Sequence, residues 1–297
     1  MEESGQIHEI ESFIPLTLQR DLGKLKRVIL LGDENQLPPI VKSQVIRTQC
    51  MYHLSLFNRL IKSGYKNIIN LTQQGRSRSE IVDLYRYKYN NLSDMNDIIK
   101  SYPKNNFGFK HNVQFINIEE FNSKGEEMNS SYSYYNLPEA EYCIGIFMYM
   151  CLVGYNPENI TILCTYNGQK ELIKEIYNKK CTWNKLFSNI GKICTVDKYQ
   201  GQQNDYVILS LVRTKKIGYL RDIRRFIVSL SRARKGLFIL GKWDLFSNCI
   251  ELKETFDVLK NRHNYKSKKL EICLEGKIRK ILKWKILDIC IDLFKNC

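Results

Sequence analysis

The stretch Ile193–Val212, ICTVDKYQGQQNDYVILSLV, decides how the chain is interpreted. It opens and closes with apolar runs, ICTV and YVILSLV, which have the length and the β-branched residues of buried strands. The segment between these runs is polar and contains Gly201 together with Gln200, Gln202 and Gln203. Two continuous apolar runs without polar alternation predict strands of a sheet that is covered on both faces.

The same pattern extends outward along the chain. Further strands are expected at Lys26–Leu31, Asn67–Leu71, Val113–Ile118, Asn159–Cys164 and Leu237–Leu240. Helices are expected at residues 7–20, His53–Ser63, Ser79–Asn90, Glu139–Val153, Gln169–Asn178 and Arg224–Arg234. Loops are expected at residues 92–112 and 122–134. Strands that alternate with helices predict an α/β fold, with a parallel sheet and helices on both of its faces.

Polar segments that follow the predicted strands are the places to look for chemistry, because ligands of such sheets bind beyond the carboxyl ends of the strands. Five segments qualify: Met1–Gln6, Gly32–Pro39, Thr72–Arg78, Thr165–Gln169 and Val196–Asp205. A sixth candidate is the predicted helix FIVSLSRARKG with Arg232 and Arg234. Carboxylates, amides, arginines and loop glycines together are typical of sites for nucleoside triphosphates and Mg²⁺.

Composition narrows the class of protein. The formal net charge of the 297 residues is +15, and residues 213–235 contain nine Lys or Arg against one acid, Asp222. Such a cluster suits a polyanion such as nucleic acid. Residues 262–285 near the C-terminus contain nine Lys or Arg against two acids, and there a solubilising surface is the simpler interpretation. No apolar run approaches the ~20 residues that span a bilayer, and no signal peptide is apparent at the start. Ten cysteines without a C-x-x-C pair favour a reducing compartment.

Read in order, the polar segments resemble the motifs of superfamily 1 helicases of the up-frameshift (DNA2/NAM7) type. EES-GQ resembles the D-E-A/S-x-Q Walker B box, and GDENQLPP the G-D-x-x-Q-L-P-P motif. LTQQGRSRSEI is similar to L-x-x-Q-Y-R, and ILCTYNGQK to T-P-Y-x-x-Q. VDKYQGQQND resembles V-D-x-F-Q-G-x-E-x-D, and the segment with SLSRAR resembles the L-T-R-A-R box. Six motifs in the family order are a specific signal.

Two unusual letters narrow the resemblance to the Aquarius group of intron-binding spliceosomal helicases. That group has QGQQND where most relatives have glutamate at the position of Gln203, and glycine at the position of Gly75. The resemblance implies a RecA-like P-loop NTPase architecture and an ATP-dependent RNA helicase that acts in pre-mRNA splicing. It also implies a nuclear protein with single-stranded pre-mRNA introns and spliceosomal proteins as partners, and no membrane association.

The resemblance also implies a site for ATP and Mg²⁺. Glu3 is expected to polarise the attacking water, Glu2 to lie beside the Mg²⁺, and Gln36 to sense the γ-phosphate. Arg76 and Arg232 are expected to act as arginine fingers, so that the catalytic set is Glu3, Gln36, Arg76 and Arg232. The residues expected to contact ATP or Mg²⁺ are Glu2, Glu3, Asp33, Gly201, Gln203 and Arg232.

Four other residues are expected on the nucleic-acid side. The resemblance places Thr165, Tyr166, Gln169 and Thr195 on the surface that binds the single strand, with Thr195 at the sugar-phosphate backbone. Simpler interpretations exist for the charged residues: Glu2 and Glu3 suit the acidic first turn of a helix, and Arg76 suits a solvated surface. Arg232 and Arg234 are two residues apart and cannot share a helix face, so at least one is expected to face inward or toward a partner.

The chain departs from the family in one respect. No G-x-x-x-x-G-K-[ST] motif occurs in it, although superfamily 1 helicases need this P-loop to hold the phosphates. The resemblance therefore implies the last part of a first RecA-like domain (residues 1–45), a complete second one (46–246) and a basic extension (247–297), inactive on their own. Residues 1–45 are expected to be poorly stabilised alone, or to dock on the second domain, because their sheet neighbours are missing.

Three interpretations remain open at this point. The first is the C-terminal part of an ATP-dependent RNA helicase. The second is a non-catalytic relative of the helicases that binds RNA or spliceosomal proteins. The third is a superfamily 1 DNA helicase, since the choice of RNA over DNA rests on the resemblance and not on any base-reading residue.

Overall fold

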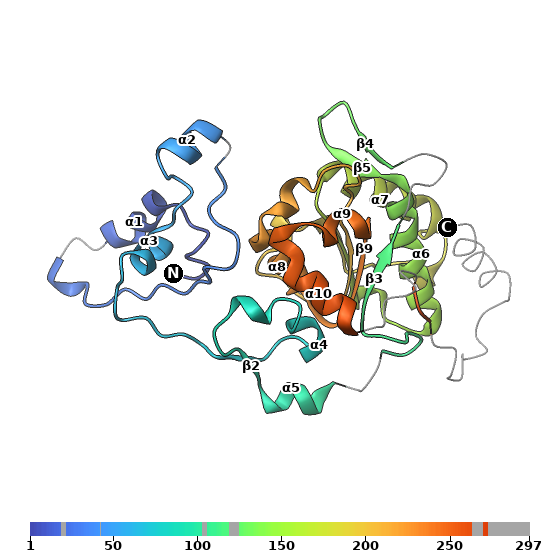
Figure 1. Cartoon of the computed structure of the whole chain (residues 1–297), viewed down its shortest axis with the longest axis horizontal. Helices are drawn as coiled ribbons and strands as arrows, with labels where there is room; N and C mark the ends of the chain where they lie inside the picture. The colour runs from blue at the N-terminus through green and yellow to red at the C-terminus, as the bar shows by residue number, and fades with distance from the viewer. Residues whose placement is uncertain (19–21, 42, 103–105, 119–124, 263–269, 273–297) are drawn as a thin grey trace. The chain divides into compact units, whose positions relative to one another are not determined.

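The computed structural model describes residues 1–18, 22–41, 43–102, 106–118, 125–262 and 270–272 (Figure 1). They form two compact units, Met1–Leu71 and Thr72–Cys297, which are described separately below. Residues 46–71 pack with the first unit, and the domain boundary at residue 45 stays a prediction. The amphipathic segment LKWKILDICIDLF of the tail lies outside the described residues.

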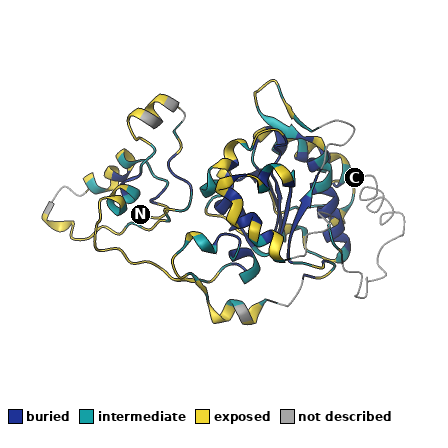
Figure 2. Ribbon diagram, viewed as in Figure 1, coloured by how far each residue is buried: buried dark blue, intermediate teal, exposed yellow. Residues whose placement is uncertain are grey.

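The described residues of the first unit form three α-helices. They are α1 (Glu9–Thr17), α2 (Gln44–Gln49) and α3 (Leu56–Lys62). Helices α1 and α3 were expected from the sequence, and an ion pair between Glu9 and Arg59 joins them at 2.5 Å. Figure 2 shows that most of this unit is exposed or half-buried.

The strand predictions in the first unit were wrong. Lys26–Leu31 and Asn67–Leu71 form no strand, and Val28, Ile29 and Leu31 are 47%, 67% and 54% exposed. Lys26–Leu31 instead exchanges backbone hydrogen bonds with the N-terminal residues: the Leu31 nitrogen donates to the Met1 carbonyl at 2.9 Å, and the Ser4 nitrogen donates to the Leu31 carbonyl at 2.8 Å. Apolar runs become strands only where neighbouring strands accept their backbone hydrogen bonds.

The second unit is built on a parallel sheet of five strands in the order β3-β9-β8-β6-β7. The strands are β3 (Val113–Asn117), β6 (Ile160–Cys164), β7 (Lys192–Thr195), β8 (Asn204–Ser210) and β9 (Ala233–Gly241). All four pairings within the sheet are parallel, which confirms the predicted fold class. All five strands were expected from their apolar runs.

One face of the sheet is covered by α6 (Leu137–Val153) and α7 (Asn167–Lys180). Asn136 caps α6 by accepting a hydrogen bond from the Glu139 nitrogen, and Gly154 ends the helix at φ +110°. The helix is apolar around most of its circumference and is accordingly buried. Ile162, Ile208 and Phe238, which are register neighbours on three adjacent strands, pack against it. Side chains alternate between the two faces of a sheet, so these three share one face.

The opposite face packs against α8 (Ile223–Leu230), α9 (Trp243–Ser247) and α10 (Lys253–Arg262). Phe256 of α10 lies at the centre of an aromatic cluster on this face. Its ring centre is 5.4 Å from that of Phe115, 5.2 Å from that of Trp243 and 6.1 Å from that of Phe226. Figure 2 shows the buried residues concentrated in the strands and in the helices beside them.

Short elements occupy the segments that were expected to be loops or one long helix. The predicted helix Ser79–Asn90 is shorter, with α4 (Ser79–Val82) and a 3₁₀ turn (Arg86–Lys88). The predicted loops contain β2 (Ser93–Asp94), which pairs with β1 (Gln73–Gln74), then α5 (Asn96–Ser101), and the hairpin of β4 (Glu126–Met128) and β5 (Tyr134–Asn136). These elements are held by tertiary contacts that local sequence patterns do not reveal.

The aromatic cluster yields a stability prediction. Replacement of Phe256, which is 2% exposed, by alanine should leave a cavity and lower the free energy of unfolding by about 3–5 kcal/mol. Urea unfolding followed by tryptophan fluorescence measures the change. Tyr132→Ala is the control, because Tyr132 is 83% exposed and its loss should cost less than about 0.5 kcal/mol. Equal losses for the two variants would contradict the packing described here.

Candidate functional site

Segment 76–78 lies against residues 231–234, where β9 begins. The Ser77 hydroxyl donates to the Ala233 carbonyl at 2.7 Å, and the Arg78 nitrogen donates to the Arg234 carbonyl at 2.9 Å. Arg76 Nη1 consequently lies 3.5 Å from the carbonyl oxygen of Ser231. The structure therefore brings Arg76 next to Arg232, although the two are far apart in sequence. We call this end of the sheet, where β8 and β9 begin, the amino end.

Arg232 is buried, with 1% of its surface exposed. Its Nε donates to the Val228 carbonyl at 3.0 Å, in the last turn of α8, where a positive charge complements the helix dipole. Its Nη1 donates to the Gln202 carbonyl at 3.2 Å. The expected helix through Arg234 was wrong, because α8 ends at Leu230 and β9 begins at Ala233. The expectation that one of the two arginines faces inward is confirmed by the burial of Arg232.

The loop Gly201–Gln203 completes the amino end. Gly201 has φ +75°, a conformation that favours glycine, and a Cβ there would meet nothing within 4 Å. Gln203 is exposed, and the Asn204 nitrogen donates to the Arg232 carbonyl at 3.0 Å. Arg76, an expected arginine finger, and the three residues of this unit expected to contact ATP, Gly201, Gln203 and Arg232, thus lie on adjoining segments. The open space above Gly201 leaves its backbone accessible to a ligand.

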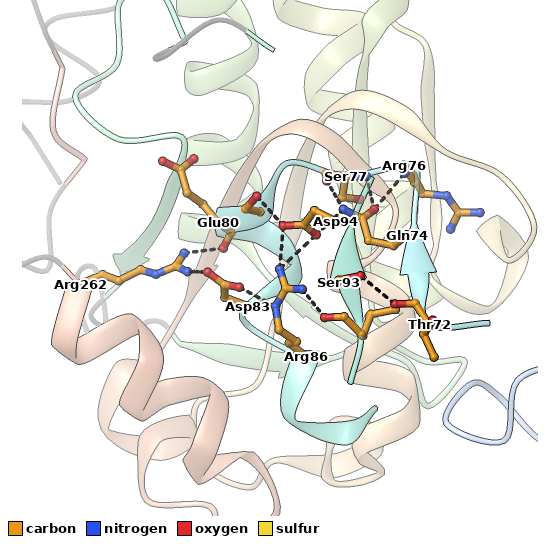
Figure 3. A network of polar contacts seen from close by, with 12 residues as sticks. Thr72, Gln74, Arg76, Ser77, Glu80, Asp83, Arg86, Ser93, Asp94 and Arg262 are labelled. Atoms are coloured by element: carbon orange, nitrogen blue, oxygen red, sulfur yellow. Dashed lines mark hydrogen bonds and ion pairs between the residues drawn. The ribbon is translucent and has the colours of Figure 1, made fainter. Parts of the chain in front are cut away.

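A polar network fixes the loop that carries Arg76 (Figure 3). Gln74 Oε1 accepts hydrogen bonds from the backbone nitrogens of Arg76 and Ser77, both at 2.9 Å. Gln74 Nε2 donates to the Ser77 carbonyl at 2.7 Å and to Asp94 Oδ1 at 2.8 Å. One amide side chain therefore uses both ends to set the backbone conformation of this loop.

Asp94 anchors the network. Its carboxylate accepts two hydrogen bonds from Arg86 Nη2, at 3.1 and 2.9 Å, and one from the Ser79 hydroxyl at 2.6 Å. Burial acts to raise the pKa of Asp94, but the hydrogen bonds from Ser79, Gln74 and Arg86 outweigh it and hold this pKa below its usual range. Arg86 also pairs with Asp83, which contacts Arg262 of α10 (Figure 3). The charged carboxylate is the state that the network stabilises.

At the carboxyl end of the sheet, most of the residues that were expected to contact nucleic acid are buried. Tyr166 is 6% exposed, Thr195 is 7% exposed, and Thr165 is half-buried with its hydroxyl 3.1 Å from the Leu211 carbonyl. Gln169 is fully buried, and its amide bonds to both backbone groups of Asn136 and to the Ser210 hydroxyl. Direct contact between Gln169 and a nucleic acid is therefore incompatible with this conformation, and its role here is to hold the start of α6.

Glu139 is a site residue that sequence reasoning missed. It is fully buried, and its Oε2 accepts hydrogen bonds from the Ser210 hydroxyl at 2.6 Å and from the Val212 nitrogen at 2.8 Å. Val212 has φ +71°, a strained conformation for a β-branched residue. Burial raises the pKa of Glu139 to about 7, even though these hydrogen bonds act to lower it. An acid at the start of an otherwise apolar helix was the available signal in the sequence.

Arg213, next to Val212, was also missed. Its Nε and Nη2 donate to the Glu126 carboxylate at 2.9 and 3.2 Å, and both side chains are less than a tenth exposed. Its guanidinium lies 3.8 Å from the centre of the Tyr134 ring, and Nη1 donates to the Tyr166 hydroxyl at 3.2 Å. The β4–β5 hairpin thereby clamps the segment that leaves β8.

The first unit arranges its predicted residues around a local turn. The Asp33 carboxylate accepts hydrogen bonds from the Asn35 nitrogen at 2.9 Å and from Gln36 Nε2 at 3.0 Å. Close packing brings Met1–Gln6 beside this turn, since a Cβ on Gly32 would lie 2.9 Å from the Gly5 nitrogen. Glu2 and Glu3 are exposed, and Glu3 has φ +50°. They precede α1 by several residues, so they do not form the first turn of a helix.

Comparison with known proteins bears on this arrangement. Residues 52–244 match a family described as an AAA domain, and residues 1–44 match a second family with the same description. The RNA helicase aquarius of Mus musculus is 45% identical over 267 residues.

The chain belongs to the superfamily 1 helicases of the up-frameshift type. Two other relatives agree: regulator of nonsense transcripts 1 of Dictyostelium discoideum is 34% identical over 257 residues, and the ATP-dependent helicase NAM7 of Saccharomyces cerevisiae is 32% identical over 247. The matches cover 88%, 83% and 81% of this chain, but only 18%, 18% and 25% of aquarius, the regulator and NAM7. The parallel sheet with helices on both faces is the RecA-like architecture of this helicase family.

The carboxylates of the described residues bear on how a metal ion could be held. Among the residues that the structure describes, no three His, Cys, Asp or Glu side chains are grouped to hold a metal ion. Mg²⁺ in nucleotide sites is held through one or two carboxylates and the substrate phosphates, so the exposed Glu2 is compatible with that mode.

No helix in the described part of the chain has the length and apolarity needed to cross a membrane.

Glu139 yields a prediction of pH dependence. Its folded-state pKa, about 7, lies above the ordinary value of 4.5, so the folded protein binds the proton more tightly than the unfolded one. The resulting stabilisation is complete below about pH 4.5 and disappears as the pH rises through 7; it amounts to roughly 3 kcal/mol. Urea unfolding between pH 5 and pH 8 should therefore show wild-type stability falling, relative to Glu139→Gln, as the pH rises.

Glu175→Gln is the matched control, because it makes the same chemical change on a side chain that is 59% exposed. The control should follow the pH profile of the wild type. Parallel pH profiles for the wild type and Glu139→Gln would show that Glu139 does not bind a proton in this range.

Proposed function

We propose that this chain supplies the arginine fingers and the strand-binding surface of an ATP-dependent RNA helicase. The observation that carries the proposal is the meeting of Arg76, Arg232 and the Gly201 loop at the amino end of the sheet. Two guanidinium groups held close together repel each other unless an anion lies near them. Their charges both act to lower the pKa of the neighbouring Tyr85, although burial raises it overall, so the site has a positive potential.

The residues present fit a triphosphate. ATP, when bound, supplies the γ-phosphoryl group whose transfer to water drives the helicase. Arg76 is half-buried on a loop fixed by Gln74, which suits a guanidinium that must be pre-oriented toward developing negative charge. Arg232 holds the Gly201 loop through the Gln202 carbonyl, so that any role as a finger depends on exchange of this hydrogen bond for phosphate. We assign Arg76 a direct contact with the γ-phosphate. Arg232 is assigned a contact with the phosphate that it shares with the Gln202 carbonyl.

In the first unit we propose the roles that the family resemblance implies. Glu3 would polarise water and Glu2 would lie beside Mg²⁺, while Asp33 and Gln36 form one hydrogen-bonded turn that responds to the γ-phosphate. The G-x-x-x-x-G-K-[ST] motif is not among these 297 residues. We therefore propose that hydrolysis requires a P-loop in addition to the residues described here.

RNA is the proposed nucleic acid, and splicing is the proposed process. The likeness to the RNA helicase aquarius supports RNA, and the resemblance to intron-binding spliceosomal helicases supports pre-mRNA introns, spliceosomal protein partners and the nucleus. Thr165 remains the accessible member of the expected strand-binding set. The exposed Lys215 and Lys216, which follow Arg213 at the carboxyl end of the sheet, are proposed to contact phosphates.

Binding to short oligonucleotides tests this function. The full chain should bind a fluorescent single-stranded 12-mer of RNA, and the affinity should fall steeply as KCl is raised, because each phosphate contact releases counterions. Fluorescence anisotropy measures both quantities. The double variant Lys215→Ala, Lys216→Ala should lower the slope of log K against log[KCl] by about 1.4.

The double variant Lys253→Ala, Lys260→Ala is the control, since it removes the same charge from exposed positions of α10. Affinity that does not depend on salt, or an equal loss in both double variants, would contradict the proposed surface. Tighter binding of single-stranded DNA than of RNA would favour the DNA helicase interpretation instead.

A further inference from the structure

We propose that Tyr219 is a base-stacking residue at the carboxyl end of the sheet, and that one base of a bound single strand rests on its ring. The inference rests on the proposed RNA-binding function and adds to it a contact that the expected residues do not provide. Tyr219 lies in the one-turn 3₁₀ helix Gly218–Arg221, in the connection between β8 and α8.

The expected strand-binding residues leave a chemical gap. Tyr166 is buried among neighbouring side chains, Thr195 is 7% exposed and Gln169 is fully buried, so none of the three presents an aromatic face to a ligand. Tyr219, in contrast, is 60% exposed. Proteins that bind single strands combine a basic surface with exposed aromatic rings on which bases stack. Tyr219 is an exposed aromatic ring beside the predicted Tyr166.

The backbone of Tyr219 is held in place from below. Its nitrogen donates to the Tyr166 hydroxyl at 3.4 Å, and the two ring centres are 5.5 Å apart. Gly218 has φ +65°, and a Cβ there would lie 2.3 Å from the same hydroxyl. Only glycine permits this close approach. Tyr166 therefore positions the exposed Tyr219 ring through a hydrogen bond to its backbone and a ring contact.

Positive charge lies around the ring. The Arg225 guanidinium is 5.2 Å from the centre of the Tyr219 ring, and Arg225 Nε is 3.3 Å from Asp197 Oδ1. Lys215 and Lys216, in the same connection, are exposed. An aromatic ring that would accept a base thus lies beside the Arg225 guanidinium, and the connection that carries it also carries two exposed lysines that would accept flanking phosphates. This combination favours a single-stranded nucleic acid over an apolar peptide as the occupant.

Trp183, another exposed aromatic residue of this unit, lies at the other end of the sheet. Trp183 is 63% exposed, but it follows the C-terminal end of α7, and its indole nitrogen donates to the Lys180 carbonyl at 2.6 Å. Because α7 begins just after β6, its C-terminal end lies at the amino end of the sheet, away from Tyr219. Trp183 is therefore the matched control for an exposed aromatic residue of this unit.

The test compares single-stranded RNA with an abasic oligomer of the same length. Tyr219→Ala should weaken binding of an oligo(A) 12-mer about 5- to 150-fold, which is the range for loss of one base–aromatic stack. Binding of the abasic oligomer, and the slope of log K against log[KCl], should not change, because the phosphate contacts remain. Tyr219→Phe should bind within about twofold of the wild type, because stacking uses the ring and not the hydroxyl. Trp183→Ala should bind both ligands as the wild type does.

The outcomes separate this inference from the function beneath it. A wild type that binds no single strand would overturn the proposed function and the stacking role together. A wild type that binds RNA, with Tyr219→Ala equal to it, would overturn the stacking role alone. An equal loss of affinity for the abasic oligomer would also overturn it. A large loss of affinity in Tyr219→Phe would overturn it as well, and the thermal unfolding midpoint of that variant checks that it is folded.

Discussion

The parallel pairing of β8 with β9 is the constraint on which the second unit depends. It places Asn204 beside Ala233 and Ser210 beside Leu240, so the beginnings of the two central strands meet at one end of the sheet and their ends meet at the other. The residues immediately before these two strands, the Gly201 loop before β8 and Arg232 before β9, lie at the amino end. Arg213, just after β8, and Tyr219, in the connection that follows it, lie at the carboxyl end, where both contact the Tyr166 hydroxyl. Residues proposed for phosphate and for RNA are thereby separated by the length of the strands.

Buried and half-buried polar groups at the two ends give the loops a defined geometry. At the amino end, Asp94 fixes Gln74, which fixes the backbone that carries Arg76. At the carboxyl end, Glu139 holds the strained Val212, and Glu126 holds Arg213 beside it. A buried polar group that loses its partner costs more free energy than the hydrogen bond itself contributes, so such networks resist alternative loop conformations.

The sequence was informative where the signal is local and limited where it is not. Five continuous apolar runs predicted the five strands of the sheet, because a strand covered on both faces needs no alternation. The run at Lys26–Leu31 has the same composition but no strand partner, and composition does not reveal partners. Motif order predicted Arg76 and Arg232, whereas the burial of Gln169 and the network of Glu139 arise from contacts between segments more than 30 residues apart. Tyr219 was not singled out, since exposure is a property of the folded chain.

The central claim is that the two ends of one sheet serve two different ligands. Hydrogen–deuterium exchange of the full chain, measured by mass spectrometry with inorganic tripolyphosphate or with a single-stranded RNA 12-mer, tests it most directly. Tripolyphosphate should slow exchange in peptides that contain residues 74–78 and 231–234, and RNA should slow it in peptides that contain residues 165–167 and 213–221. Protection of the same peptides by both ligands, or of neither set by either ligand, would contradict the account.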